Sequence, residues 1–153
     1  MEVIAKLYNS PLESGMRSLI ILDCFYPKGC DLTQITWLDY LVVNTEDVGG
    51  PASLHPKVDS RKGGELVKRK VVYEGLRLMV LLQLVDVLED GEGVSYKASE
   101  DSKPLIDLMD SSYSLRLKER AVWLAKRFRH LDKKEFEYTI NQKLGKWSLE
   151  FNE

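Results

Sequence analysis

The sequence predicts a mainly α-helical chain that carries one small β-hairpin. Over residues 64–84, apolar side chains recur at steps of three to five, the period of a buried helix face; they are Leu66, Val67, Val71, Val72, Leu76, Met79 and Val80. After this helix the period changes to two, which predicts two short strands joined by an acidic turn in which Gly91 supplies a positive φ. With two more predicted helices in front, this order is the outline of a winged-helix domain.

Length and charge set the frame for the whole chain. The 153 residues are enough for a domain that buries about 70% of its unfolded surface without disulfides. We predict a winged-helix-like domain over residues 1–110, with a long loop at 45–63, and a C-terminal helical extension over 111–153 that packs on it. The net charge of −2 is nearly neutral. Any binding of nucleic acid must therefore be local.

The first predicted helix follows a short extended segment at residues 3–8. We expect Ser10 to cap this helix, Pro11 to occupy its first turn, and Glu13 to reach back and complete a capping box. The residue before Pro27 is disfavoured in an α-helix, which predicts the helix end. The expected buried stripe consists of Leu12, Met16, Leu19, Ile20 and Phe25.

A second capping-box pattern, formed by Asp31 and Gln34, predicts a helix that ends near Asn44. Its inward-facing residues are expected to be Ile35, Leu38, Leu41 and Val42. Residues 45–63 show no period, and their glycines and prolines favour irregular structure. Loops of this length are usually functional or mobile. This loop contains His55, which either stabilises a turn or contacts a partner.

Helices also dominate the predicted C-terminal part. Ser102 is expected to cap a short helix that is broken at Ser111-Ser112. The next helix has the clearest apolar stripe in the chain, formed by Tyr113, Leu117, Ala121, Leu124 or Ala125, and Phe128. Asp132 and Glu135 predict a capping box for a last helix with Phe136, Ile140 and Leu144 on its apolar face. The final predicted element is a strand with an apolar side formed by Trp147, Leu149 and Phe151.

The sequence contains no motif for catalytic, metal or nucleotide chemistry. P-loop, Cys-x-x-Cys, His-Glu-x-x-His and Gly-x-Ser-x-Gly patterns do not occur. Without nearby histidines, Cys24 and Cys30 are expected to be packed free thiols. We therefore expect a protein that is not an enzyme and that uses no cofactor or metal.

The pattern of hydrophobic residues also indicates where the protein resides. The longest apolar run is far shorter than the roughly 20 residues that span a bilayer. The N-terminus lacks the basic and apolar regions of a signal peptide. We expect a cytoplasmic protein with no membrane contact.

Basic residues gather in two segments, 57–70 and 116–134. The first holds six basic and two acidic residues, and the second holds eight basic and two acidic residues. Either segment suits phosphate groups, but a solvated helix face explains such charges equally well. The candidates for contact with DNA are Arg61, Lys62, Lys68, Arg69, Lys70 and Arg127. The acidic hairpin turn, with Glu89, Asp90 and Glu92, argues against insertion of its tip into DNA.

Five short segments, taken together, resemble the middle component of bacterial ABC-three-component systems. They are Asn9-Ser10-Pro11-Leu12-Glu13, Trp37-Leu38-Asp39-Tyr40, Pro51-Ala52-Ser53-Leu54-His55-Pro56, residues 61–66 and Glu74-Gly75-Leu76. The resemblance extends from about Asn9 to Phe128 and concerns the order and length of the motifs. Within that group, the chain is similar to the small third subunit of Lamassu-type anti-phage defence complexes.

The resemblance implies a non-enzymatic accessory subunit. Such a subunit would dock on an SMC- or Rad50-like coiled-coil ATPase subunit of the same operon and couple the sensing of DNA to an effector subunit, often a nuclease. Double-stranded DNA would be contacted through the complex. Because aromatic anchors concentrate binding energy, the candidate partner contacts are His55, Trp147, Leu149 and Phe151. The last three residues would alternatively form a strand that pairs with residues 3–7.

A free-standing winged-helix DNA-binding transcription regulator is the alternative function. It would form a homodimer with the apolar stripe of residues 113–128 as its seam. The acidic turn and the length of the helix predicted over 64–84 both count against it. A regulator of this kind would be expected to have a short recognition helix and a wing without acidic residues at its tip.

Overall fold

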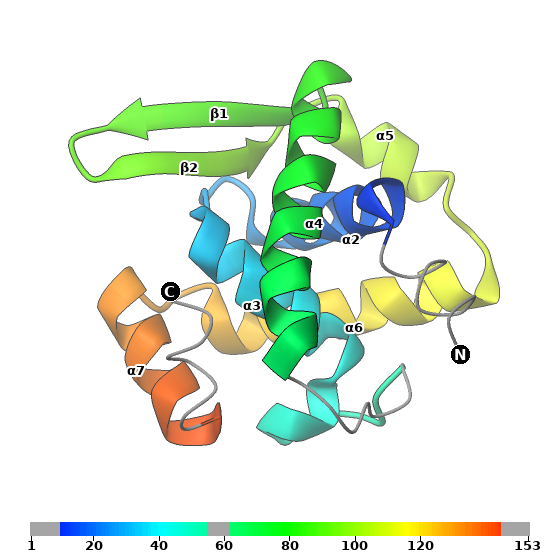
Figure 1. Cartoon of the computed structure of the whole chain (residues 1–153). Coiled ribbons are helices and arrows are strands. Elements are labelled where there is room, and N and C mark those ends of the chain that lie inside the picture. Colours follow the sequence, from blue (N-terminus) through cyan, green and yellow to red (C-terminus); the bar gives the residue numbers. More distant parts are fainter. Residues whose placement is uncertain (1–9, 55–61, 145–153) are drawn as a thin grey trace.

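A computed structural model, which describes residues 10–54 and 62–144, shows a helical body from which one β-hairpin projects (Figure 1). This arrangement confirms the prediction of a mainly α-helical chain with a small hairpin. The elements, in chain order, are α2 (Pro11–Phe25), α3 (Leu32–Val43), the 3-10 helix η1 (Thr45–Val48), α4 (Lys62–Leu81), β1 (Val85–Asp90), β2 (Gly93–Ala98), α5 (Ser102–Asp107), α6 (Ser112–Phe128) and α7 (Lys133–Leu144). The strands predicted at 3–8 and 147–151 lie outside the described residues.

Helix α2 lies at the centre of the body and contacts α3, α4, α5, α6 and β2. The Ser10 hydroxyl accepts a hydrogen bond from the Glu13 backbone N–H at 3.2 Å, which confirms the predicted cap, although the described contacts do not include the return bond from the Glu13 side chain. The predicted burial of Leu12 is wrong, because its side chain is 54% exposed in the first helical turn. The spacing of apolar residues assigns Leu12 to the buried face of the helix. It does not show whether a neighbouring element extends far enough to cover the first turn.

The contact between α2 and α4 is made backbone to backbone at two glycines. A Cβ atom on Gly75 would lie 2.6 Å from the Gly15 nitrogen and 2.7 Å from the Pro11 carbonyl oxygen. A Cβ on Gly15 would lie 2.8 Å from the Gly75 carbonyl oxygen. No side chain fits at either position, so these glycines set the distance between the two helices.

A buried ion pair links α2 to α3. The Nε atom of Arg17 donates to Oδ1 of Asp39 at 2.8 Å, and both side chains are almost fully buried. Burial alone would lower the pKa of Arg17, but the Asp39 carboxylate outweighs this effect and the pKa is raised. Arg17 therefore stays charged in the core, at a position where the sequence predicted no buried charge.

The predicted capping box of α3 is confirmed: the Gln34 N–H donates to Asp31, and the Asp31 N–H donates to the Gln34 side chain. The loop predicted at 45–63 is shorter, because η1 occupies its start and α4 already begins at Lys62. Arg120 of α6 also holds this loop by donating twice to the Ala52 carbonyl oxygen, at 2.7 and 3.0 Å. The described part of the loop is thus packed against the body.

Strands β1 and β2 form an antiparallel hairpin in which Val85 pairs with Ala98 and Asp90 with Gly93. The sequence predicted both strands, but it placed the positive φ wrongly. Gly93, at φ 119°, adopts that conformation, and Gly91 does not. The Asp90 carboxylate accepts a hydrogen bond from the Glu92 N–H at 2.8 Å. This side-chain contact shapes the start of the turn, and the residue with positive φ lies at the end of the turn.

Helix α6 covers the face of the body formed by α2 and α3. Its apolar stripe is buried as predicted; Leu117, Ala121, Leu124, Ala125 and Phe128 all belong to the core. Because these side chains already pack within their own chain, the predicted use of this stripe as a homodimer seam is wrong. The boundary at residue 110 between a winged-helix-like domain and a C-terminal extension stays a prediction.

Two of the three C-terminal helices begin with a side-chain cap. The predicted cap at Ser102 is wrong, because its hydroxyl donates to the Ser99 carbonyl oxygen inside the preceding turn. Ser111, predicted only as a break, caps α6 by accepting from the Ser114 N–H at 3.1 Å. The capping box of α7 is confirmed by reciprocal bonds between Asp132 and Glu135.

The buried ion pair predicts that loss of one partner is worse than loss of both. Arg17→Met should lower the free energy of unfolding by about 3–5 kcal/mol, because it leaves the Asp39 carboxylate buried without its cation. Arg17→Met combined with Asp39→Leu should cost less than the single variant. Urea unfolding followed by circular dichroism measures both differences. A single-variant cost below about 1 kcal/mol would contradict this role.

The glycine contact predicts that Gly75→Ala destabilises the protein despite the higher helix propensity of alanine. We expect a loss of about 2 kcal/mol, because the new methyl group meets backbone atoms that cannot move aside. Gly91→Ala is the control, since no atom lies within 4 Å of its would-be Cβ. The midpoint temperatures of thermal unfolding of the two variants measure this difference in stability. Equal midpoints would show that α2 and α4 separate without cost.

Candidate interaction surfaces

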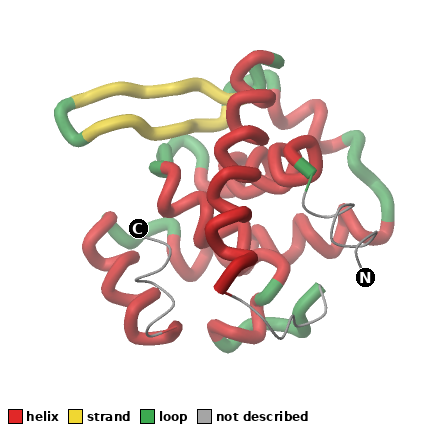
Figure 2. The backbone as a smooth tube through the Cα atoms, in the orientation of Figure 1, coloured by secondary structure: helices red, strands yellow, loops and turns green. Residues whose placement is uncertain are grey.

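Most residues of the hairpin are exposed, and we call residues 85–98 the hairpin arm. The base of the arm is anchored in the core by Val85, Tyr96 and Ala98. Beyond this base the arm extends past the helices, as the projecting strands in Figure 2 show. Val87, Leu88 and Val94 are 41–45% exposed there. Val87 and Val94 share one face of the arm and form a small apolar surface that another molecule could cover, while Leu88 lies on the opposite face.

The arm and the turn that follows it are acidic. Asp86, Glu89, Asp90, Glu92, Glu100 and Asp101 all lie exposed between residues 85 and 101. Lys97 is the one basic residue in this segment. Its Nζ atom lies 5.6 Å from the centre of the Tyr26 ring, at the base of the arm. The free part of the arm therefore carries negative charge, which supports the expectation that its tip does not enter DNA.

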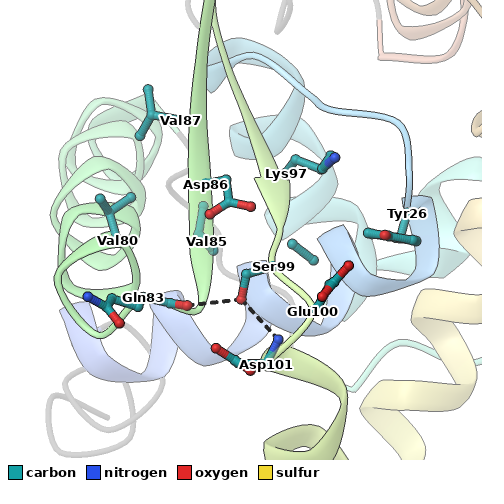
Figure 3. Close-up of a pocket in the computed structure, with 11 residues that line it drawn as sticks. Tyr26, Val80, Gln83, Val85, Asp86, Val87, Lys97, Ser99, Glu100 and Asp101 are labelled. Atoms are coloured by element: carbon teal, nitrogen blue, oxygen red, sulfur yellow. Dashed lines mark hydrogen bonds between the residues drawn. The ribbon is translucent and has the colours of Figure 1, made fainter.

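An open depression of about 660 Å³ lies where the arm meets α4. Figure 3 shows Val80, Gln83 and Val87 on one side, Val85 and Asp86 in the middle, and Tyr26 beyond Lys97. The Ser99 hydroxyl donates to the Gln83 carbonyl oxygen at 2.9 Å and so closes the floor. The depression is shallow and has no converging set of catalytic groups. It extends the exposed surface of the arm rather than enclosing a small molecule.

The structure describes the side chains of three of the six predicted DNA-binding residues, Arg69, Lys70 and Arg127. Lys70 and Arg127 are exposed on α4 and α6, and Arg127 stacks over Trp123 with 5.6 Å between its guanidinium carbon and the ring centre. Arg69 donates to the Thr33 hydroxyl at 3.1 Å. The side chains of Arg61, Lys62 and Lys68 lie outside the described part of the structure. Their role in DNA contact stays a prediction.

Several basic residues of segment 116–134 have structural partners. Lys118 donates to the Met109 carbonyl oxygen at 2.6 Å, and Lys133 lies 3.2 Å from the Asp31 carboxylate. The hydrogen bond between Lys133 and the Asp31 carboxylate raises the pKa of Lys133. Arg120, expected outside the apolar stripe, is 9% exposed because its guanidinium group turns toward Ala52. Fewer basic side chains are thus available to phosphates than their number in the sequence indicates.

The four residues predicted to contact a partner, His55, Trp147, Leu149 and Phe151, lie outside the described residues. The exposed apolar residues of the arm, which the structure does describe, were not among the predicted contacts. The period-two alternation of Val87 and Val94 predicted two strands but not which side faces solvent, and Leu88 lies outside that alternation. The signal that could have identified them is the acidic turn beside them, because a strand with such charges is rarely covered by its own core.

The cysteines behave as the packed thiols that we expected. Cys24 and Cys30 are free, and burial raises their pKa values to about 11 and about 12. Both thiols are therefore protonated near neutral pH and weakly reactive. Across residues 10–54 and 62–144, no group of three or more histidine, cysteine or acidic side chains is arranged to hold a metal ion.

Helix lengths and hydropathies bear on membrane contact. In the described ranges, none of the helices combines the length and the apolar character that crossing a bilayer demands. The longest of them, α4, carries four basic residues within its first nine positions.

Comparison with known proteins identifies the family. Searches among curated proteins and among solved structures found no significant match. The model of one protein family, described as ABC-three component (ABC-3C) system Middle Component 2, matches residues 7–150, which is nearly the whole chain. This match agrees with the resemblance seen in the five sequence segments. The chain therefore belongs to the Middle Component 2 family of ABC-three component systems.

Proposed function

We propose that the protein is a non-enzymatic accessory subunit of a bacterial anti-phage defence complex of the Lamassu type. It docks on an SMC- or Rad50-like ATPase subunit encoded in the same operon and couples the sensing of DNA to an effector subunit. Membership of the middle-component family carries this proposal, because a middle component of a three-component system has partner subunits. The family match covers residues 7–150, so the proposal concerns the chain as a whole.

The shape of the molecule suits an adaptor. A compact helical core holds a projecting arm in place, and the arm exposes apolar residues that a partner would cover. The order of α2, α3 and α4 before the hairpin supports a winged-helix-like interpretation of the domain. The buried stripe of α6 weakens the alternative of a free-standing regulator, because it removes the dimer seam that this function required.

Contact with double-stranded DNA forms a second part of the proposal. The exposed charges of Lys70 and Arg127 are available to phosphates, while the acidic arm points elsewhere. DNA would therefore be bound by the helical body and only as part of the assembled complex. A chain with a net charge of −2 is not expected to bind DNA strongly by itself.

Native mass spectrometry tests the assembly. The chain should be purified alone and after co-expression with its neighbouring genes, with an unrelated tagged protein as the control for carry-over. We expect a stable species that contains the chain together with the large ATPase. A homodimer of the chain that leaves the ATPase unbound would contradict the accessory role and favour the transcription regulator.

Salt titration tests the contact with DNA. Replacing Lys70 and Arg127 with glutamine should reduce the salt slope of DNA binding by the assembled complex by up to about two units, because each phosphate contact contributes about one. Lys143→Gln on α7 is the control for an exposed charge outside the candidate set. An unchanged slope in the double variant would assign the DNA surface to other residues or another subunit.

A further inference from the structure

We propose that the free edge of β1 receives an extended segment of a partner subunit, which would turn the two-stranded arm into a three-stranded sheet. The incoming segment alternates apolar and basic side chains. This inference rests on the proposed function, because it takes the partner from the same complex. It adds the surface, the mode of contact and the chemistry of the partner segment.

The two edges of the hairpin differ. On the outer side of β2, the Tyr96 N–H donates to the Cys30 carbonyl oxygen at 2.8 Å, and the Cys30 N–H donates to the Tyr96 carbonyl oxygen at 2.9 Å. Cys30, in the connection between α2 and α3, thus closes part of that edge. Among the described residues, no bridge or strand pairs with the outer side of β1. The edge available for pairing is therefore that of β1.

The register shows which backbone groups this edge presents. Because the N–H and C=O of Tyr96 point outward to Cys30, the pair of Tyr96 with Val87 is a non-hydrogen-bonded pair of the antiparallel ladder. The N–H and C=O of Val87 then point outward on the opposite edge. Because the direction of the backbone groups alternates along a strand, the N–H and C=O of Glu89 also point outward. Those of Leu88 point inward to Ser95. Within the described part of the chain, the outward N–H and C=O groups of Val87 and Glu89 have no partner and can serve as donors and acceptors for a further strand.

The side chains around this edge define the incoming segment. Val87 and Val94 lie on one face of the arm, where an apolar side chain of the segment would cover them. Asp86 and Asp90 lie exposed on the other face, and Glu89 lies near the tip. A segment that pairs with β1 brings its own side chains directly beside these carboxylates. Basic residues at alternate positions are the complement.

The same charges disfavour other occupants. A second copy of the chain, pairing β1 with β1, would bring the acidic residues of both arms together, and like charges placed opposite each other destabilise a sheet. The phosphate backbone of nucleic acid would also be repelled. A basic, apolar strand from another protein satisfies both the hydrogen-bonding edge and the charge, as in recognition by strand addition.

Variants of the arm test the pairing in the co-expressed complex. Val87→Pro removes an outward N–H and leaves the inward ladder bonds of the hairpin in place, whereas Val87→Thr keeps the N–H. We expect Val87→Pro to weaken the assembly at least about tenfold and Val87→Thr to weaken it much less. Circular dichroism of the free chains checks that both variants fold.

Charge reversal gives a second test that leaves the backbone unchanged. Glu89→Lys combined with Glu92→Lys, two exposed side chains near the tip, should weaken the assembly at least about tenfold, because basic residues of the partner then meet like charges. Asp110→Lys combined with Glu119→Lys changes the net charge equally at exposed sites outside the arm, and should leave the affinity nearly unchanged. Equal losses in both double variants would show a general charge effect and overturn the proposal.

Hydrogen exchange on the unmodified protein separates this proposal from the proposed function. In the free chain the Val87 and Glu89 amides should exchange rapidly and the Leu88 amide slowly. In the complex, the Val87 and Glu89 amides should slow at least about a hundredfold. A stable complex without this protection overturns strand addition and leaves the accessory role intact. Failure of the wild-type chain to assemble overturns both.

Discussion

The close approach of α2 and α4 at Gly15 and Gly75 is the constraint on which the rest of the structure depends. With no side chain between them, the two backbones come into contact, and α4 is held across the centre of the body (Figure 1). The chain enters β1 only a few residues after α4 ends, so the place of α4 decides where the arm leaves the body. A wider spacing would detach the base of the arm from the core.

The core combines this contact with two buried arginines that hold neighbouring elements. Arg17 connects α2 to α3 through Asp39, and Arg120 connects α6 to the loop after η1 through Ala52. Both positions exclude alternative packings, because a displaced helix would leave a charge buried without its partner. These contacts link the helices to one another, and the base of the exposed hairpin is anchored in the same core. An adaptor needs such anchoring if a partner is to meet the same edge each time.

Charge divides the surface in a way that fits a subunit with two kinds of neighbour. The arm is acidic and partly apolar, whereas most of the exposed basic residues that the structure describes belong to helices. Protein and nucleic acid would then occupy different parts of the molecule. The near-neutral total of −2 conceals this division, because opposite local charges cancel in the sum.

Local signals in the sequence predicted most of the described elements. The capping boxes at Asp31 and Asp132 and the stripe of α6 depend on residues within one or two helical turns, so they are readable without knowledge of the fold. The match of the family over residues 7–150 likewise agrees with motifs that were visible in the chain. The glycine of the hairpin turn was misplaced by two residues, because the Asp90 side chain changes the turn geometry in a way that a dipeptide pattern does not encode.

By itself the sequence determined the helices, the hairpin and the kind of system to which the protein belongs. The tertiary structure decided which residues are buried and which face outward: Arg17 and Arg120 lie inside, while Leu12 and Val87 lie outside. It also distinguished the two edges of the hairpin: Cys30, from a distant part of the chain, pairs with β2, whereas none of the described residues pairs with the outer side of β1. Burial and edge pairing are long-range properties, set by the elements that meet in space.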